Sequence, residues 1–247
     1  MGAGDAMAGP VKIGAILPPG NPTVEAELRR MAPGVALALA SLVNPPSSGA
    51  TGEPEGMEAR ARRYVDALDG PAREIGRAAP TVVVLAHTAS SYVNGFASEP
   101  ALVARLASGS GAPAVTAAGA VRAALLSLGV KRLALGTPYP ESITALGLAY
   151  WRAAGFDVVS YRRLGDIPDI YATTEAQARD LARAVDAADA DGVLLSGTGM
   201  PTVGVLAELE RELGKPVVSS NQALLWQALR LIGLTPAISG FGRLLSS

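Results

Sequence analysis

The chain has 247 residues, 49% of them hydrophobic and 17% charged, which is enough apolar material for one large domain or two small ones. Its net charge of −1, with lysine and arginine spread along the sequence, gives no sign of a nucleic-acid partner or a basic membrane-binding patch. The absence of cysteine excludes disulfides, thiolate metal sites and cysteine nucleophiles, and a single histidine argues against any metal site. No apolar run has membrane-spanning length and the first residues lack a signal-peptide pattern, so we expect a soluble cytoplasmic protein with no membrane partner.

Apolar strands alternate with amphipathic helices along the chain, with Asn21 as the expected cap of the first helix and Pro22 as its first residue. This alternation predicts an α/β fold in which parallel strands are joined by right-handed crossovers. The Pro-, Ser- and Gly-rich segment Asn44–Gly56 is expected to be a long loop of the kind that often binds ligands. In chain order, the expected elements are strand Lys12–Leu17, helix Val24–Met31, strand Val35–Val43, helix Glu58–Ala79, strand Val82–Ala86, helix Pro100–Ala107, strand Ala112–Thr116, helix Ala118–Leu128, strand Lys131–Leu135, a helix ending at Ala154, strand Phe156–Tyr161, helix Thr173–Ala187, strand Gly192–Ser196, helix Val203–Leu213, strand Pro216–Ser219 and helix Gln222–Leu231.

Three segments of the first part of the chain have counterparts, in the same order, in the second part. KIGAILPPGNP resembles KRLALGTPYP, since both are a lysine-led apolar strand that breaks into a proline-rich turn. VVVLAHT resembles GVLLSGT, with His87 opposite Gly197, and Ala112–Gly129 resembles Lys215–Gly233. The repeat predicts two similar α/β halves, one formed by residues 1–115 with 220–247 and the other by residues 116–219.

Ligands of open parallel sheets bind beyond the carboxyl ends of the strands, so two facing halves would bring four turns together. These turns are Pro18–Thr23, Ala86–Ser91, Pro138–Tyr139 and Ser196–Gly199. They offer the amide of Asn21, the backbone N–H groups around Gly197 and Gly199, and many hydroxyls. Such donors bind anions without a formal positive charge, and a carboxylate or an enolate-like oxyanion is the expected guest. The hydroxyl residues are Thr23, Thr88, Ser90, Ser91, Thr137, Tyr139, Ser196 and Thr198.

His87 is the one side chain of these turns whose ordinary pKa is near neutral, which makes it the candidate general acid or base. Each of these residues also has a structural interpretation. A histidine at a strand end is often a packed or capped side chain, and Ser90 and Ser91 suit helix caps. Tyr139, between two prolines, could pack against its turn, and the glycines around Thr198 lack the spacing and lysine of a phosphate-binding loop.

Four stretches of the sequence are similar to the aspartate/glutamate racemase superfamily, and within it to the arylmalonate decarboxylases and the maleate cis–trans isomerases. Asp191–Gly233 strongly resembles the decarboxylases, and Ala134–Tyr139 and Leu85–Gly95 also fit them. Asn21–Pro33 resembles the isomerases, with its Asn-x-Thr-Val-Glu turn. The resemblance covers nearly the whole chain. It implies two Rossmann-like halves related by a pseudo-twofold axis, a site in the cleft between them, and a reaction without a cofactor.

The resemblance also implies roles for individual residues. Racemases and isomerases of the superfamily have one cysteine after each central strand, at the positions of His87 and Gly197, whereas the decarboxylases keep only the second cysteine. The decarboxylase anion hole corresponds to Thr88, the backbone at Ala89, Tyr139, and the backbone at Gly197 and Thr198. A second hydroxyl of that hole is replaced by Ala89. We expect the remaining substrate contacts from Pro19, Asn21 and Ser90.

A chain without cysteine cannot catalyse two-thiol racemisation or form the covalent thioether of the isomerases. The leading hypothesis is a lyase that decarboxylates a malonate-like acid, with His87 as the proton donor from the opposite face of the intermediate. Alternatives are an isomerase, or an enzyme that cleaves C–C or C–N bonds, with His87 as the base. A carboxylate-binding protein without activity and a variant engineered to lack cysteine also remain open. The partner in each case is a small carboxylic acid, and the sequence leaves open whether the chain forms a homo-oligomer.

Overall fold

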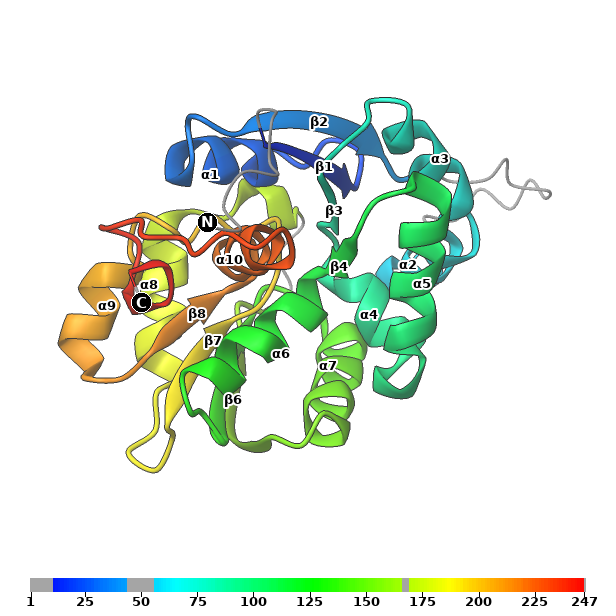
Figure 1. The fold of residues 1–247 in the computed structure, drawn as a ribbon. Helices are drawn as coiled ribbons and strands as arrows, with labels where there is room; N and C mark the ends of the chain where they lie inside the picture. The colour runs from blue at the N-terminus through cyan, green and yellow to red at the C-terminus, as the bar shows by residue number, and fades with distance from the viewer. Residues whose placement is uncertain (1–10, 44–55, 166–168, 247) are drawn as a thin grey trace.

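The computed structural model describes residues 11–43, 56–165 and 169–246, and these form two parallel four-stranded sheets (Figure 1). The first sheet has the strand order β2-β1-β3-β4 and the second has the order β6-β5-β7-β8, so the two orders are equivalent. The predicted α/β fold with two similar halves is therefore confirmed. The strands are β1 Lys12–Leu17, β2 Ala36–Ser41, β3 Val82–Leu85, β4 Ala114–Thr116, β5 Arg132–Thr137, β6 Asp157–Arg163, β7 Gly192–Leu195 and β8 Val217–Ser219.

The helices connect successive strands and cover the sheets. None within the described residues is long and apolar enough to cross a membrane. The segment predicted as a long loop, Asn44–Gly56, lies outside the described residues except for Gly56. The helices are α1 Thr23–Met31, α2 Met57–Asp66, α3 Asp69–Gly76, α4 Thr88–Asn94, α5 Glu99–Ser110, α6 Ala117–Ser127, α7 Glu141–Ala153, α8 Glu175–Val185, α9 Leu206–Leu213 and α10 Ser220–Leu231, with short 3₁₀ turns at Phe96–Ser98, Ile170–Ala172 and Arg243–Leu245.

Two expected elements differ from the structure. The single helix predicted over Glu58–Ala79 is divided into α2 and α3, and Pro71 stands in the first turn of α3. A proline is tolerated there because its missing N–H would have no partner within the helix, whereas in a continuous helix it would break a hydrogen bond. The second difference is α4, at a stretch interpreted as a polar turn. Hydroxyl residues disfavour helices, but Thr88 to Val93 are all buried, so packing outweighs local preference.

The helix α10 lies in the middle of the molecule and contacts both sheets (Figure 1). It packs against α6, against β3 and β4 of the first sheet, and against β8 of the second. Its first residue, Ser220, is also the predicted boundary between the halves, which stays a prediction. The helix α10 begins where β8 ends, and its Ser220 hydroxyl lies 3.3 Å from that of Thr88 after β3, so its first turn lies near the strand ends of both sheets.

Candidate active site

The structure joins three of the four predicted turns through hydrogen bonds between the halves. The Thr23 hydroxyl donates to the Gly199 carbonyl at 2.8 Å, which joins the turn after β1 to the turn after β7. The Thr198 hydroxyl donates to the Ala86 carbonyl at 2.9 Å, which joins the turns after β7 and β3. Since each bond connects one sheet to the other, the strand ends face a common region.

A cluster of buried hydroxyls lies in this region. Thr88 Oγ1 is 3.3 Å from Ser220 Oγ, which also accepts the N–H of Gly197 at 3.0 Å. Tyr139 is the third member of the cluster. Its hydroxyl oxygen lies close to Gly197, because a Cβ built on that glycine would be 3.4 Å from this oxygen. Ser220 was not among the predicted site residues. The internal repeat contains a signal for it, since Ser220 stands where the matching segment Ala112–Gly129 has Ala117.

The anion hole implied by the resemblance includes three backbone N–H groups, and two of these are available. Ala89 is the second residue of α4, where an N–H has no partner within the helix. The N–H of Thr198 makes no hydrogen bond to any described residue. The N–H of Gly197 is already bonded to Ser220. The available donors are therefore those of Ala89 and Thr198.

Gly197, which the resemblance sets opposite the second cysteine of the racemases and isomerases, has little room for a side chain. Its φ is +125°, a conformation that L-residues rarely adopt, and a Cβ would lie 3.1 Å from Cγ and Cδ of Pro138. A thiol at this position would require movement of the chain. The local backbone at Gly197 thus favours glycine.

His87 lies between β3 and α4, and the residue as a whole is half-buried. Its Nδ1 is 2.8 Å from Ser90 Oγ, and Tyr64 of α2 packs edge-on against the ring with centroids 5.4 Å apart. Burial, and secondly the positive charge of Arg60, lowers the pKa of His87 to about 3. This corrects the expectation that His87 titrates at its ordinary pKa, and it makes the imidazole neutral at pH 7. Because Nδ1 is engaged by Ser90, Nε2 is the nitrogen available to a ligand.

The lowered pKa of His87 predicts an acid-sensitive contribution to stability. The unfolded chain binds a proton at this ring near pH 6.5 and the folded chain only near pH 3, so stability falls as the pH decreases through this window. At pH 5 a full shift would cost about 2 kcal/mol, and partial exposure reduces this to about 1 kcal/mol. Urea unfolding at pH 7 and pH 5 should show a smaller acid loss in His87→Asn than in the parent. An equal loss in both proteins would contradict the shift.

Tyr139 is 3% exposed, and burial raises the pKa of its phenol, with a further increase from the nearby Tyr92. The two rings meet edge to face, with centroids 6.3 Å apart. Tyr92 is itself fixed, because its hydroxyl accepts from Trp151 Nε1 at 2.8 Å and shares a 2.7 Å hydrogen bond with Ser196. Tyr139 therefore stays protonated and acts as a hydrogen-bond donor.

The predicted substrate-binding residues of the first turn have different surroundings. Asn21 Oδ1 accepts the N–H groups of Thr23 and Val24 at the start of α1, although the cap position is Pro22, one residue later than expected. Asn21 Nδ2 is buried without a partner, 3.8 Å from the position of a Cβ on Gly199, so it can donate to a ligand. Pro19 is exposed, and no described contact joins it to the hydroxyl cluster.

Some hydroxyls of the four turns have structural partners instead. Ser90 is bonded to His87, and Ser91 donates to Glu99 at 3.2 Å, away from the cluster. Tyr171 is a residue that the sequence did not indicate, and its ring covers Gly199, where a Cβ would lie 2.8 Å from two ring carbons. The positive charge of Arg60 lowers the pKa of both the Tyr64 and the Tyr171 phenol, against the larger rise caused by burial. Arg60 therefore lies near both rings, on the same side of the site.

A family model described as arylmalonate decarboxylase matches residues 13–245. The chain belongs to the arylmalonate decarboxylase family. The arylmalonate decarboxylase of Bordetella bronchiseptica is 35% identical over 242 residues, 94% of this chain and 95% of its own length. The maleate isomerase of Nocardia farcinica is 32% identical over 243 residues, 95% of each chain. A crystal structure of arylmalonate decarboxylase superposes with a TM-score of 0.78 at 31% identity, covering 95% of this chain and 98% of the other.

Proposed function

We propose that this member of the arylmalonate decarboxylase family is a cofactor-independent lyase that removes one carboxyl group from a disubstituted malonate-like acid. The observation that carries the proposal is the convergence of Thr88, Tyr139 and the N–H groups of Ala89 and Thr198 at the ends of facing sheets, with His87 directly before Thr88. A set of fixed donors of this kind stabilises an oxyanion more strongly than water does. The relatives supply the reaction class.

In the proposed reaction, the carboxylate that remains on the substrate binds in the cluster. The C–C bond to the second carboxylate breaks, CO2 leaves, and the electron pair of that bond is delocalised into the remaining carboxylate as an enediolate. The hydroxyls of Thr88 and Tyr139 and the two N–H groups donate to its oxygens. The α carbon then takes a proton from His87 Nε2, and the ring regains a proton from solvent.

The lowered pKa of His87 sets a condition on this step. A neutral imidazole is a poor acid, so the ring must gain a proton when the substrate binds. A malonate-like dianion beside the ring raises its pKa, because an opposite charge within a few ångströms favours the protonated form. Substrate binding thus protonates His87, the proposed proton donor, and is coupled to the uptake of one proton.

Isomerisation of a maleate-like acid is the second candidate, because the Nocardia farcinica maleate isomerase aligns over 95% of both chains. This chain has no cysteine for covalent addition, so an isomerase would need His87 as the base. Such a reaction exchanges or moves a proton without loss of CO2, and the two candidates are therefore separated by their products.

The test is proton NMR in D2O with aryl- and alkyl-substituted malonates, 2-aryl carboxylic acids and maleate. Release of CO2 with one deuterium at the α carbon supports the lyase. Conversion of maleate to fumarate, with no reaction of any malonate, would replace the lyase by the isomerase. Saturable binding of the acids without turnover would identify a binding protein instead.

A further inference from the structure

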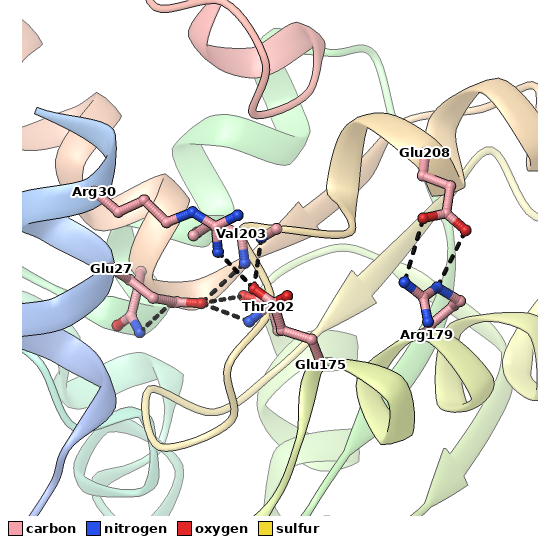
Figure 2. A network of polar contacts seen from close by, with 9 residues as sticks. Glu27, Arg30, Glu175, Arg179, Thr202, Val203 and Glu208 are labelled. Carbon is pink, nitrogen blue, oxygen red and sulfur yellow. Dashed lines mark hydrogen bonds and ion pairs between the residues drawn. The ribbon is translucent and has the colours of Figure 1, made fainter.

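Glu27 of α1 is a buried carboxylate that the proposed reaction does not use. It is 4% exposed, and within the described part of the chain it makes no ion pair. Burial raises its pKa, and hydrogen bonds from Thr202, Val203 and Asn221 oppose that rise. Figure 2 shows its carboxylate against the backbone of residues 202 and 203, beside the Arg30–Glu175 ion pair. Burying a carboxylate without a cation is costly, so its bonds need a structural or functional reason.

The two oxygens of Glu27 bind two segments that lie far from it in the sequence. Oε1 accepts the N–H groups of Thr202 and Val203, the latter at 2.9 Å. Oε2 accepts from Asn221 Nδ2 in α10 at 2.7 Å. Gly204 N–H is taken by Glu175 at 3.1 Å. The loop between β7 and α9 has no helix or strand of its own, and glutamates from outside it accept the N–H groups of residues 202–204.

Asn221 connects Glu27 to the candidate anion hole. The same Nδ2 group donates to the Thr198 carbonyl at 3.1 Å, and Thr198 in turn donates from its hydroxyl to Ala86, the residue before His87. A bonded path thus leads from Glu27 through Asn221 to Thr198. All of its side chains are at most 4% exposed, so water does not compete easily for these bonds.

We propose that Glu27 is a positioning residue, which holds Asn221 so that Asn221 fixes Thr198 and its N–H in the anion hole. The inference rests on the proposed function, because it assigns that N–H to the substrate carboxylate. A carboxylate suits the role better than an amide, since both of its oxygens accept, one from the loop and one from Asn221. A glutamine has one accepting oxygen, and its NH2 group would oppose the NH2 group of Asn221.

The atoms involved allow a test by exchange of the two side chains. Glu27→Gln sets two donors against each other, and Asn221→Asp sets two acceptors against each other, so each single variant should be less stable. In the double variant, the oxygen of the introduced glutamine can still accept from the loop while its NH2 group donates to the introduced aspartate. The pair is thereby restored in reverse, but the aspartate has no proton to donate to Thr198.

Three measurements are made on the parent, the single variants and the double variant: urea unfolding, calorimetric binding of phenylacetate, and hydrogen exchange of residues 197–203 by mass spectrometry. We expect the double variant to regain most of the stability of the parent. Its affinity for phenylacetate should stay at least about tenfold lower, because a displaced donor no longer meets the carboxylate. Exchange should accelerate at residues 197–200 and stay slow at Thr202 and Val203.

Glu210→Gln is the matched control, because Glu210 is a buried carboxylate that accepts the N–H groups of Val217 and Arg243 outside the site. It should lose stability and keep its affinity for phenylacetate. Recovery of affinity in the double variant, or parental exchange at residues 197–200, would overturn the positioning role. If the double variant does not fold, Asn221→Ala is measured, and parental exchange there overturns it as well. If the parent neither binds phenylacetate nor turns over any acid, the proposed function fails, and hydrogen exchange still decides the link from Glu27 to Thr198.

Discussion

Replacement of His87 by asparagine is expected to slow the decarboxylation of an arylmalonate by about 10²–10⁴-fold, the usual contribution of a positioned acid or base. Asparagine has the size of the inner part of the ring, and its amide can still pair with Ser90, which is 2.8 Å from Nδ1 in the parent. The variant therefore removes Nε2, the proposed proton donor, and changes little of the packing against Tyr64. The rate of CO2 release at saturating substrate, measured with both proteins, checks this prediction.

Two further experiments test whether the loss of rate in His87→Asn comes from loss of the proton donor. Ser90→Ala removes the partner of Nδ1 and keeps the ring, so the rate should fall by about tenfold or less, consistent with the loss of one hydrogen bond. Calorimetry in buffers of different ionisation enthalpy should show proton uptake on binding of a malonate by the parent and none by His87→Asn. A parental rate in His87→Asn would assign protonation of the enediolate to another group.

The sequence predicted the architecture because its patterns are local. Buried strands such as Val82–Leu85 are continuous apolar runs, and amphipathic helices alternate with most of the strands. The repeat extends this to two sheets of equivalent strand order, since similar segments in the same order fold in the same way. Residues at the carboxyl ends of strands could therefore be chosen as candidates, and Thr88, Tyr139 and Thr198 do lie together.

What the sequence could not supply depends on contacts between distant residues. Tyr64 reaches His87 from α2, and the burial it contributes to lowers a pKa that is near neutral for an isolated histidine. Glu27 accepts a hydrogen bond from Asn221, which is 194 positions away in the chain. Nothing in the sequence around either residue indicates that its polar side chain is buried. The helix α4 was missed for the same reason, because burial by the rest of the molecule decides its conformation.

Replacement of Tyr139 by phenylalanine is expected to lower the rate by about 10²–10³-fold, the loss that follows removal of one donor from an oxyanion hole. The ring would stay in its packed position against Tyr92, so the fold should be preserved. The size of the loss should not depend on pH between 6 and 9, because the raised pKa of Tyr139 keeps the phenol protonated throughout that range. Steady-state rates with an arylmalonate at several pH values test both points.

Tyr92→Phe provides the comparison, since it removes the same group from a neighbouring buried ring. The Tyr92 hydroxyl bonds Ser196 and Trp151, and we assign it no contact with the substrate. Its loss should reduce the free energy of unfolding by about 1–3 kcal/mol, because two buried partners lose a bond, and should change the rate far less than Tyr139→Phe. If the two variants lose rate equally, the hydroxyl of Tyr139 acts through packing. A loss of rate in Tyr139→Phe alone would show that the Tyr139 hydroxyl donates a hydrogen bond to the enediolate oxygen. This oxygen carries the negative charge that an enzyme must stabilise during decarboxylation.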